Sequence, residues 1–433
     1  MRICRPFLFA AAGLALTGAA QPADWPQWRG PDRSGVSAET GLLPQWPKDG
    51  PELAWSFENA GSGYGSFAVV AGRAYLLGAR PIDADGAKRT EQLIALDEKG
   101  KERWKADIGP MWDFEGNQWS GGPNSTPTVD GERIYALGSQ GILVCVKTAD
   151  GAEVWRKNLA KDFGGDVSSG GFGPEQFGWG FSWSPLVDGD KLICTPGGPK
   201  GLFVAFDKAS GNVLWRSAGL PDSCTYSSPV VAEIGDVRQY IALVQTGTVG
   251  VSAKDGLTLW QYRRETPFPD IVAPTPVVKD GLVYINAWKG GGELLRITAD
   301  GGKFKAESLY AKKEIASPHG GVVLVDKYLY GNHDLRSWEC LDFSTGAVKW
   351  KSSAPTTGSV IFADGRLYIL TADGQAALLE ASPDGCKELG RFPLPKMSEH
   401  HKPEGKAWAH PAVSDGKLYL RDQEYVFCYK IAK

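Results

Sequence analysis

Short runs of alternating hydrophobic and polar residues, separated by turn residues, repeat along almost the whole chain. The best-preserved unit begins at Ser125, passes through Asp130-Gly131 into a second apolar run, and ends at Trp155. Alternation with a period of two is typical of strands that bury one face. Asp-Gly between two such runs is a strong hairpin signal, because glycine tolerates the positive φ of the turn. Each unit therefore predicts three or four short antiparallel strands.

The unit recurs eight times, at the spacing expected of propeller blades. Five units end in a tryptophan four residues after a glycine, and we predict that these tryptophans pack between blades: Trp104, Trp155, Trp215, Trp260 and Trp350. In the fifth unit only Phe304 stands near that place. The eighth unit stops after its third strand, and residues 53–57, which include Trp55, are predicted to supply its fourth. We therefore predict an all-β, eight-bladed β-propeller of four-stranded blades, its ring closed by an N-terminal strand in the last blade.

Three segments are predicted along the chain. Residues 1–20 are expected to be a signal peptide, with Arg2 and Arg5 ahead of an apolar stretch and small residues before Gln21. Residues 21–50 form a Pro/Gly-rich segment, and residues 51–433 the propeller. The apolar stretch is shorter than the roughly 20 residues of a membrane span. We expect an exported, periplasmic or extracellular protein with no transmembrane segment and, since no cysteine stands at the cleavage site, no lipid anchor.

Composition narrows the classes of partner. The chain has 16 tryptophans, 55 glycines and three methionines, which suits turn-rich β-structure. Its formal charge of −3 and the lack of a basic run argue against nucleic acid. Three cysteines occupy the same position in separate repeats: Cys145, Cys340 and Cys428. Equivalent positions of separate blades lie too far apart for a disulfide bond, so these cysteines are predicted to be buried thiols. The state of three others stays open: Cys194, Cys224 and Cys386.

Candidate binding residues gather on one predicted face. In a propeller, the loops that enter the innermost strands and those between the second and third strands meet at the mouth of the central channel. Aromatic, amide and charged side chains there are predicted to bind a polar cyclic ligand by stacking and hydrogen bonding: Tyr64, Asn124, Trp183, Tyr226, His319, Trp408, His410, Asp422 and Gln423. Alternatively, they satisfy loop backbone groups around a water-filled channel. The long connection at residues 161–181 is a further functional candidate.

No catalytic residue and no metal ligand is predicted. His319 and His410 open the sixth and eighth blades, and we expect that spacing to hold them too far apart to share a metal ion. His400-His401 is expected to be solvated in the linker between blades seven and eight. Three aspartates recur just before a turn, where their side chains are expected to bond backbone amides: Asp97, Asp207 and Asp342. The chain lacks the Gly-x-Ser-x-Gly motif of a serine nucleophile.

Beyond its periodicity, the sequence resembles the pyrroloquinoline-quinone-type (PQQ-like) β-propeller with its tryptophan-docking signature. Four stretches of sequence are the basis of this resemblance: WPQWRGP at residues 25–31, HGGVVLV at 319–325, WAHP at 408–411 and LRDQ at 420–423. These stretches are similar to exported bacterial PQQ-like repeat proteins, which are related to the propeller lipoprotein of outer-membrane protein assembly. The resemblance covers nearly the whole mature chain. It implies a quinoprotein-like propeller, a fold that hosts many unrelated activities.

Three functions remain open. The first is an exported, non-catalytic, monomeric propeller without a cofactor, acting as a protein-interaction scaffold or a polar-ligand-binding module with a protein or glycan partner at a loop face. The second is a divergent PQQ-dependent alcohol or sugar dehydrogenase with PQQ and Ca²⁺, built around Trp183, His319, Trp408 and Asp422. The third is a carbohydrate-binding propeller, indicated by the aromatic mouth.

The resemblance also implies which site features a quinoprotein dehydrogenase would require. Such enzymes hold the quinone between a tryptophan and a vicinal disulfide, with an ion bridging it to carboxylates. The chain has no adjacent cysteine pair, and no loop clusters the roughly six to eight oxygen ligands that calcium takes. The sequence therefore favours a non-catalytic protein, and it identifies no substrate, partner or pathway.

Overall fold

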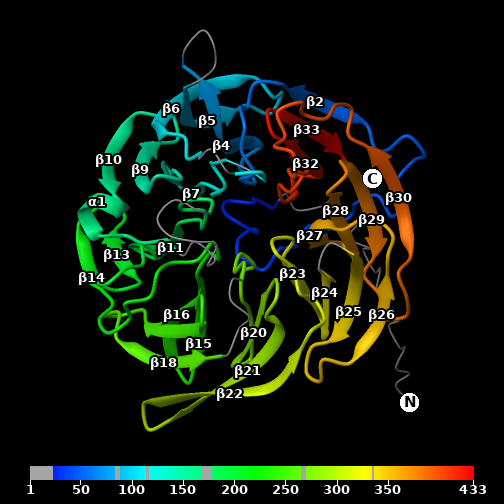
Figure 1. Cartoon of the computed structure of the whole chain (residues 1–433). Helices are drawn as coiled ribbons and strands as arrows, with labels where there is room; N and C mark the ends of the chain where they lie inside the picture. The colour runs from blue at the N-terminus through cyan, green and yellow to red at the C-terminus, as the bar shows by residue number, and fades with distance from the viewer. Residues whose placement is uncertain are drawn as a thin grey trace, which may run out of the picture.

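The computed structural model describes residues 23–82, 88–113, 117–119, 121–167, 178–264, 270–333 and 336–433. The predicted signal peptide, residues 1–20, and residues 168–177 of the long connection lie outside them. Eight sheets follow one another around a central axis as the blades of a propeller (Figure 1). The predicted all-β, eight-bladed fold is confirmed. Within the described residues, no helix is long and apolar enough to cross a membrane.

Every blade has four antiparallel strands, numbered from the axis outward in blades 1 to 7. The first four blades contain β3 (Ala68–Val70), β4 (Arg73–Pro81), β5 (Arg89–Leu96) and β6 (Glu102–Pro110); β7 (Thr128–Asp130), β8 (Arg133–Leu137), β9 (Ile142–Lys147) and β10 (Glu153–Asn158); β11 (Leu186–Asp188), β12 (Lys191–Cys194), β13 (Val204–Asp207) and β14 (Val213–Arg216); and β15 (Val230–Ile234), β16 (Val237–Val244), β17 (Gly247–Ser252) and β18 (Thr258–Arg263). A short helix, α1 (Leu159–Phe163), follows blade 2.

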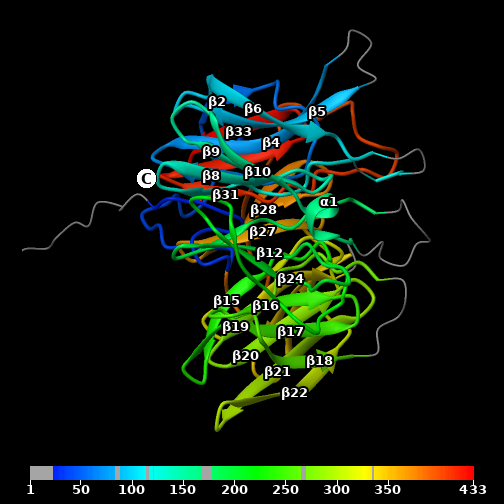
Figure 2. The ribbon, with the colours of Figure 1, turned by 90° about the vertical axis from the view of Figure 1, so that its left-hand side faces the viewer.

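Blades 5 to 7 continue the same order. They contain β19 (Val277–Lys279), β20 (Leu282–Ala287), β21 (Gly291–Asp300) and β22 (Lys303–Lys312); β23 (Val322–Val325), β24 (Tyr328–His333), β25 (Ser337–Asp342) and β26 (Val348–Ser352); and β27 (Gly358–Ala363), β28 (Arg366–Thr371), β29 (Gln375–Glu380) and β30 (Glu388–Pro393). The long β21–β22 hairpin extends farther from the ring than its neighbours (Figures 1 and 2).

Blade 8 combines both ends of the described chain. Its strands are β31 (Ala412–Ser414), β32 (Lys417–Asp422), β33 (Tyr425–Lys430) and, outermost, β2 (Leu53–Phe57). β2 pairs antiparallel with β33 and places Trp55 opposite Cys428. The predicted closure of the ring by an N-terminal strand is therefore confirmed.

Small residues in the third strand of a blade lie between two aromatic rings. In blade 2, Cys145 is opposite Tyr135 of the second strand and Trp155 of the fourth. Blade 6 repeats this register, with Cys340 between Tyr330 and Trp350. The six described cysteines are free thiols, and all but the half-buried Cys386 are buried, as predicted for the slot of Cys145.

Aromatic residues of the outermost strands pack on the next blade. The ring of Trp104 covers Gly151 so closely that a Cβ there would lie 2.5 Å from the indole. In blade 5 the corresponding ring is that of Tyr310, which covers Gly346 and donates a hydrogen bond to a blade 6 carbonyl at 2.8 Å. Phe304, the residue that the sequence placed nearest this position, packs instead against blade 4.

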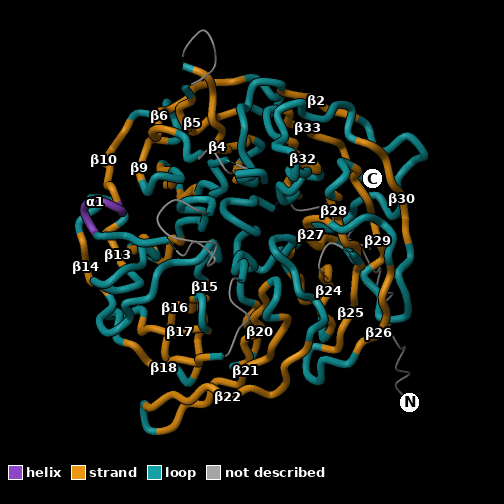
Figure 3. The backbone as a smooth tube through the Cα atoms, viewed as in Figure 1, coloured by secondary structure: helices purple, strands orange, loops and turns teal. Residues whose placement is uncertain are grey.

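The N-terminal segment, residues 23–37, runs through the centre of the ring before the first blade begins (Figures 1 and 3). Trp25 forms a bridge with Val69 of blade 1, and Trp28 Nε1 donates to Thr275 Oγ1, just before blade 5, at 2.8 Å. β1 (Val36–Ser37) then adds in parallel to the innermost strand of blade 7. This part of the axis is therefore filled by protein, not by the water-filled channel considered above.

Two arginines anchor this N-terminal segment. Arg33, 3% exposed, donates to the carbonyl oxygens of Pro229 at 2.8 Å and Ser184 at 3.0 Å. Arg29, 2% exposed, donates to the carbonyl oxygen of Val322. Burial lowers the pKa of Arg33 to about 9 and that of Arg29 to about 10, so both stay charged at neutral pH. The two guanidinium groups satisfy backbone carbonyls that blades 3, 4 and 6 present near the axis.

Candidate functional site

A cavity of about 400 Å³, here called the axial pocket, lies over the N-terminal segment on the face where loops enter the innermost strands. Its volume falls within the roughly 300–1,000 Å³ of small-molecule sites. Aromatic side chains dominate its lining: Trp28, Tyr64, Trp119, Trp179, Tyr226, Trp288, His319, Trp408 and His410. The axial pocket therefore combines broad apolar faces with polar ring edges.

A relay of hydroxyl groups holds the entering loops in place. The backbone N–H of Ser66 donates to Thr126 Oγ1 at 3.0 Å, that of Thr126 to Ser184 Oγ at 3.0 Å, and that of Ser184 to Ser228 Oγ at 2.9 Å. Each bond links one blade to the next. These bonds explain why a serine or threonine recurs at the start of successive blades. Residues two positions earlier line the axial pocket: Tyr64, Asn124, Ser182 and Tyr226.

One wall of the axial pocket consists of aromatic rings in contact, two pairs of them edge to face. The ring centroids of His319 and Trp408 lie 4.6 Å apart, and those of Trp28 and His410 lie 4.6 Å apart. Tyr64 packs on Trp408 with centroids 5.6 Å apart. Trp28 comes from the N-terminal segment, so that segment contributes directly to the pocket.

The other wall comes from the connections after blades 1, 2 and 3. The centroids of Trp179 and Tyr226 lie 5.2 Å apart, and those of Trp119 and Trp179 lie 6.3 Å apart. Asn124 Nδ2 lies 3.4 Å from the carbonyl oxygen of Trp179 and 3.3 Å from Ser182 Oγ. These contacts fix the described end of the 161–181 connection against the pocket.

His319 and His410 are neighbours, although they precede blades 6 and 8 and blade 7 lies between those two blades. His410 Nε2 lies 3.4 Å from the carbonyl oxygen of His319. The two residues lie nearer to each other than their separation by a blade suggested, because the inner ends of the blades converge at the axis (Figure 1). Burial lowers the pKa of each imidazole to about 3, so both are neutral at pH 7.

Acid should destabilise the fold through His410, which is 5% exposed. Because its folded pKa of about 3 lies below the ordinary value of 6.5, its contribution to stability is present above pH 6.5 and is lost as pH falls toward 3. Lowering the pH from 7.5 to 5 should remove about 2 kcal/mol through this group. Urea unfolding at both pH values should show that His410→Gln loses about 2 kcal/mol less than the wild type. An equal loss in both proteins would contradict a buried neutral imidazole.

Four polar atoms of the pocket-lining side chains are buried and have no hydrogen-bond partner among the described residues: Tyr226 Oη, His319 Nε2, Trp408 Nε1 and His410 Nδ1. Buried polar groups are almost always hydrogen-bonded in folded proteins. Burying these atoms without hydrogen bonds costs free energy, and a ligand that supplies the missing partners would remove that cost.

Trp183 lies outside the axial pocket, although the sequence placed it there. Its side chain is fully buried in the core between blades 2 and 3. Its neighbours Ser182 and Ser184 both line the pocket, so the alternation of the chain turns Trp183 away from it.

Asp422 and Gln423 also lie outside the axial pocket. Asp422, 1% exposed, accepts a hydrogen bond from the backbone N–H of Ser398 at 2.8 Å and lies 2.8 Å from His401 Nε2. The expectation that His401 is solvated is therefore wrong. Gln423 Oε1 accepts from the backbone N–H of Gly63 at 2.9 Å and supports the loop that carries Tyr64.

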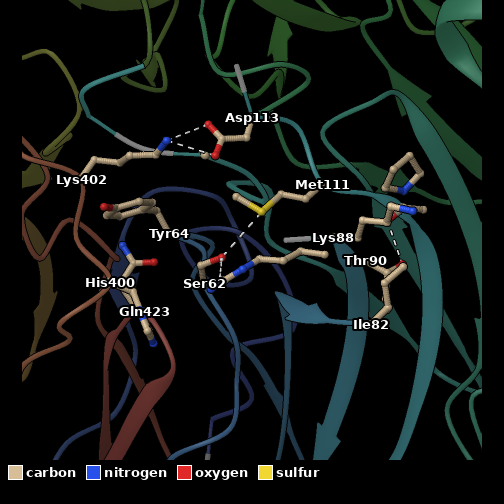
Figure 4. A pocket seen from close by; sticks show the side chains of 14 residues that line it. Ser62, Tyr64, Ile82, Lys88, Thr90, Met111, Asp113, His400, Lys402 and Gln423 are labelled. Atoms are coloured by element: carbon tan, nitrogen blue, oxygen red, sulfur yellow. Dashed lines mark hydrogen bonds and ion pairs between the residues drawn. The ribbon is translucent and has the colours of Figure 1, made fainter. Parts of the chain in front are cut away.

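Figure 4 shows a second cavity of about 820 Å³, here called the polar pocket. It lies among the β4–β5 hairpin, the connection after blade 1 and the connection before blade 8. Its described lining is Ser62, Tyr64, Ile82, Lys88, Arg89, Thr90, Gly109, Pro110, Met111, Asp113, Gly121, His400, Lys402 and Gln423. Tyr64 lines both pockets.

The axial pocket does not fit a calcium–quinone site. Its described lining has one carboxylate, Glu404, and one ammonium group, Lys406. Calcium takes about six to eight oxygen ligands, and across the described ranges no three His, Cys, Asp or Glu residues are grouped to hold a metal ion. The free thiols supply no disulfide to cover a quinone.

The chain is similar to known propellers in sequence and in fold. A family model described as outer membrane protein assembly factor BamB matches residues 89–352, more than half of the chain. The curated BamB of Nitrosomonas eutropha is 24% identical over 287 residues, which are 61% of this chain and 59% of that protein. The match thus spans less than two thirds of that relative.

Two solved structures share the architecture. BamB from Moraxella catarrhalis has a TM-score of 0.56 at 14% identity, over 85% of this chain and 94% of its own. Quinohemoprotein alcohol dehydrogenase from Comamonas testosteroni has a TM-score of 0.62 at 13% identity, over 94% of this chain and 80% of its own. At these identities, the two structures show a common fold alone.

Proposed function

We propose that this chain, which belongs to the family described as outer membrane protein assembly factor BamB, is an exported, non-catalytic binding protein. Its axial pocket takes a polar, ring-shaped ligand, and carbohydrate is the ligand class. The carrying observation is an aromatic pocket, built on Trp28, in which His319, Trp408 and His410 each keep an unpartnered polar atom. The N-terminal sequence and the family support the periplasmic or extracellular location.

Sugar rings match the chemistry of this pocket. A pyranose has an apolar C–H face that stacks on an aromatic ring, and a rim of hydroxyl groups that both donate and accept. Trp408 Nε1 is a donor only, whereas neutral His319 and His410 each offer one donor and one acceptor nitrogen. Side chains with one apolar and one polar end suit such a ligand.

The state of the histidines supports binding over catalysis. A general base works best with a pKa near the working pH. Burial lowers the pKa of His319 and His410 to about 3, which makes them weak bases at neutral pH. The dehydrogenase alternative has the common fold in its favour, but the donor set of the axial pocket does not fit its cofactor. Binding of a saccharide in the axial pocket is compatible with binding of a partner protein at the same loop face.

Replacing Trp408 by alanine should weaken saccharide binding by roughly 30-fold, or about 2 kcal/mol, because a stacking face and an indole donor are lost together. Tryptophan fluorescence during titration with a panel of neutral oligosaccharides would measure this. Tyr328→Leu is the matched control, because Tyr328 lies at the β23–β24 turn of blade 6, outside the lining of the axial pocket. The proposal fails if no oligosaccharide of the panel binds, or if Trp408→Ala keeps the wild-type affinity.

A further inference from the structure

The axial pocket and the polar pocket adjoin at Tyr64. This side chain packs on Trp408 of the axial pocket and also lines the polar pocket, where Figure 4 shows it near Lys402, His400 and Gln423. One half-buried ring therefore borders both cavities. A ligand longer than one ring would have to pass Tyr64 to occupy both cavities.

Two loops are joined beside this ring. Lys402 Nζ lies 3.0 and 3.1 Å from the carboxylate oxygens of Asp113, as drawn in Figure 4, and the backbone N–H of Glu404 donates to the carbonyl oxygen of Gln118 at 2.8 Å. These bonds connect the loop before blade 8 to the loop after blade 1. They place the ammonium group of Lys402 at the edge of the polar pocket.

Among the described residues, the lining of the polar pocket carries more positive than negative charge. Its described lining carries Lys88, Arg89 and Lys402 against one carboxylate, Asp113, whereas the whole chain has a formal charge of −3. Arg89 Nη1 donates to Ser62 Oγ at 3.1 Å, and a guanidinium group has several further N–H donors. The fork of an arginine matches the paired oxygens of a carboxylate or a sulfate.

We infer that the two pockets form one extended site for an anionic saccharide. A sugar ring occupies the axial pocket, and a carboxylate or sulfate ester on an adjoining ring binds Arg89 and Lys402 in the polar pocket. Lys402 then exchanges the carboxylate of Asp113 for the anionic group of the ligand. This inference rests on the proposed function, since it extends the same site.

Calorimetric titration with matched oligosaccharides tests this directly. The ligands have equal length and differ in one sugar, which is neutral, a uronic acid or sulfated. The wild type should bind one of the acidic forms at least tenfold more tightly than the neutral form in 50 mM salt, and this preference should shrink in 500 mM salt because counter-ions screen exposed charges. The tighter of the two acidic forms identifies the anionic group.

Two double variants make the assignment specific. Arg89→Gln with Lys402→Gln should remove the preference for the acidic form. Lys327→Gln with Lys349→Gln, on the exposed side of blade 6 around Tyr328, should keep it. Equal wild-type affinity for neutral and acidic forms would overturn this inference and leave the proposed function standing. Failure of every saccharide to bind would overturn both.

Discussion

Replacing Arg33 by alanine is expected to lower the free energy of unfolding by about 3–5 kcal/mol. Its guanidinium group is buried at the axis and donates to the carbonyl oxygens of Ser184, Pro185 and Pro229. The substitution would leave these acceptors buried without partners, at a cost of about 1–3 kcal/mol each. Equilibrium unfolding in urea at pH 7, followed by tryptophan fluorescence, measures the change.

Arg103→Ala is the matched control for Arg33. Its side chain is 61% exposed and lies 4.0 Å from Asp97, so the change should stay within about 0.5 kcal/mol. If the two variants unfold alike, the N-terminal segment is not an integral part of the fold, and the floor that Trp28 gives to the axial pocket is not fixed.

The second large effect is expected at the closure of the ring. Trp55→Ala should cost about 3–5 kcal/mol, as for other buried aromatic residues. The ring of Trp55 is 9% exposed, packs on Tyr419 with centroids 5.9 Å apart, and covers Gly100 of blade 1. Because β2 comes from the opposite end of the chain, the ring of Trp55 adds a contact between blade 8 and blade 1 at the closure.

Leu53→Ala in the same strand controls for the loss of β-propensity. Leu53 is 42% exposed, so its truncation should cost less than about 1 kcal/mol. Thermal unfolding of both variants beside the wild type checks the difference. Similar melting temperatures for Trp55→Ala and the wild type would show that packing across the closure contributes little to stability.

The fold is predictable from the sequence because its signals are local. Alternating residues mark the strands, and an Asp-Gly turn marks the first hairpin in five of the eight blades. The missing fourth strand after Tyr425–Lys430 identifies Leu53–Phe57 as its replacement. The turn role of Asp97 is equally local, and its carboxylate accepts from the backbone N–H groups of Lys99 and Lys101 at 3.0 and 2.9 Å. Signals within one hairpin need no knowledge of distant packing.

The site is predictable in part. Tyr64, Tyr226 and Trp408 line the axial pocket because their offset from the start of an innermost strand is regular. Trp183 is misplaced by one residue, which in an alternating chain reverses the direction of a side chain. Trp28 is missed as a site residue, although it stands in the WPQWRGP motif, because the path of the N-terminal segment through the ring depends on contacts far apart in sequence.

The lining of the axial pocket is not explained by the descriptions of the proteins to which this chain is similar. The family is described as an outer membrane protein assembly factor, and a quinohemoprotein alcohol dehydrogenase shares the fold, yet neither description accounts for a cavity lined by Trp28, Trp179 and Trp408. A bound polar ring would satisfy the unpartnered nitrogen atoms of His319 and His410. The proposed recognition of a ligand at the axis would account for these unpartnered atoms, which a scaffold role alone leaves unexplained.

The most direct test is a crystal structure of the chain with the tightest-binding oligosaccharide. The account predicts a sugar ring inside the axial pocket, stacked on Trp408 or Trp28, with hydroxyl groups hydrogen-bonded to His319 Nε2 and Trp408 Nε1. A saccharide bound on the outer strands of the blades, with the axial pocket filled only by water, would contradict it.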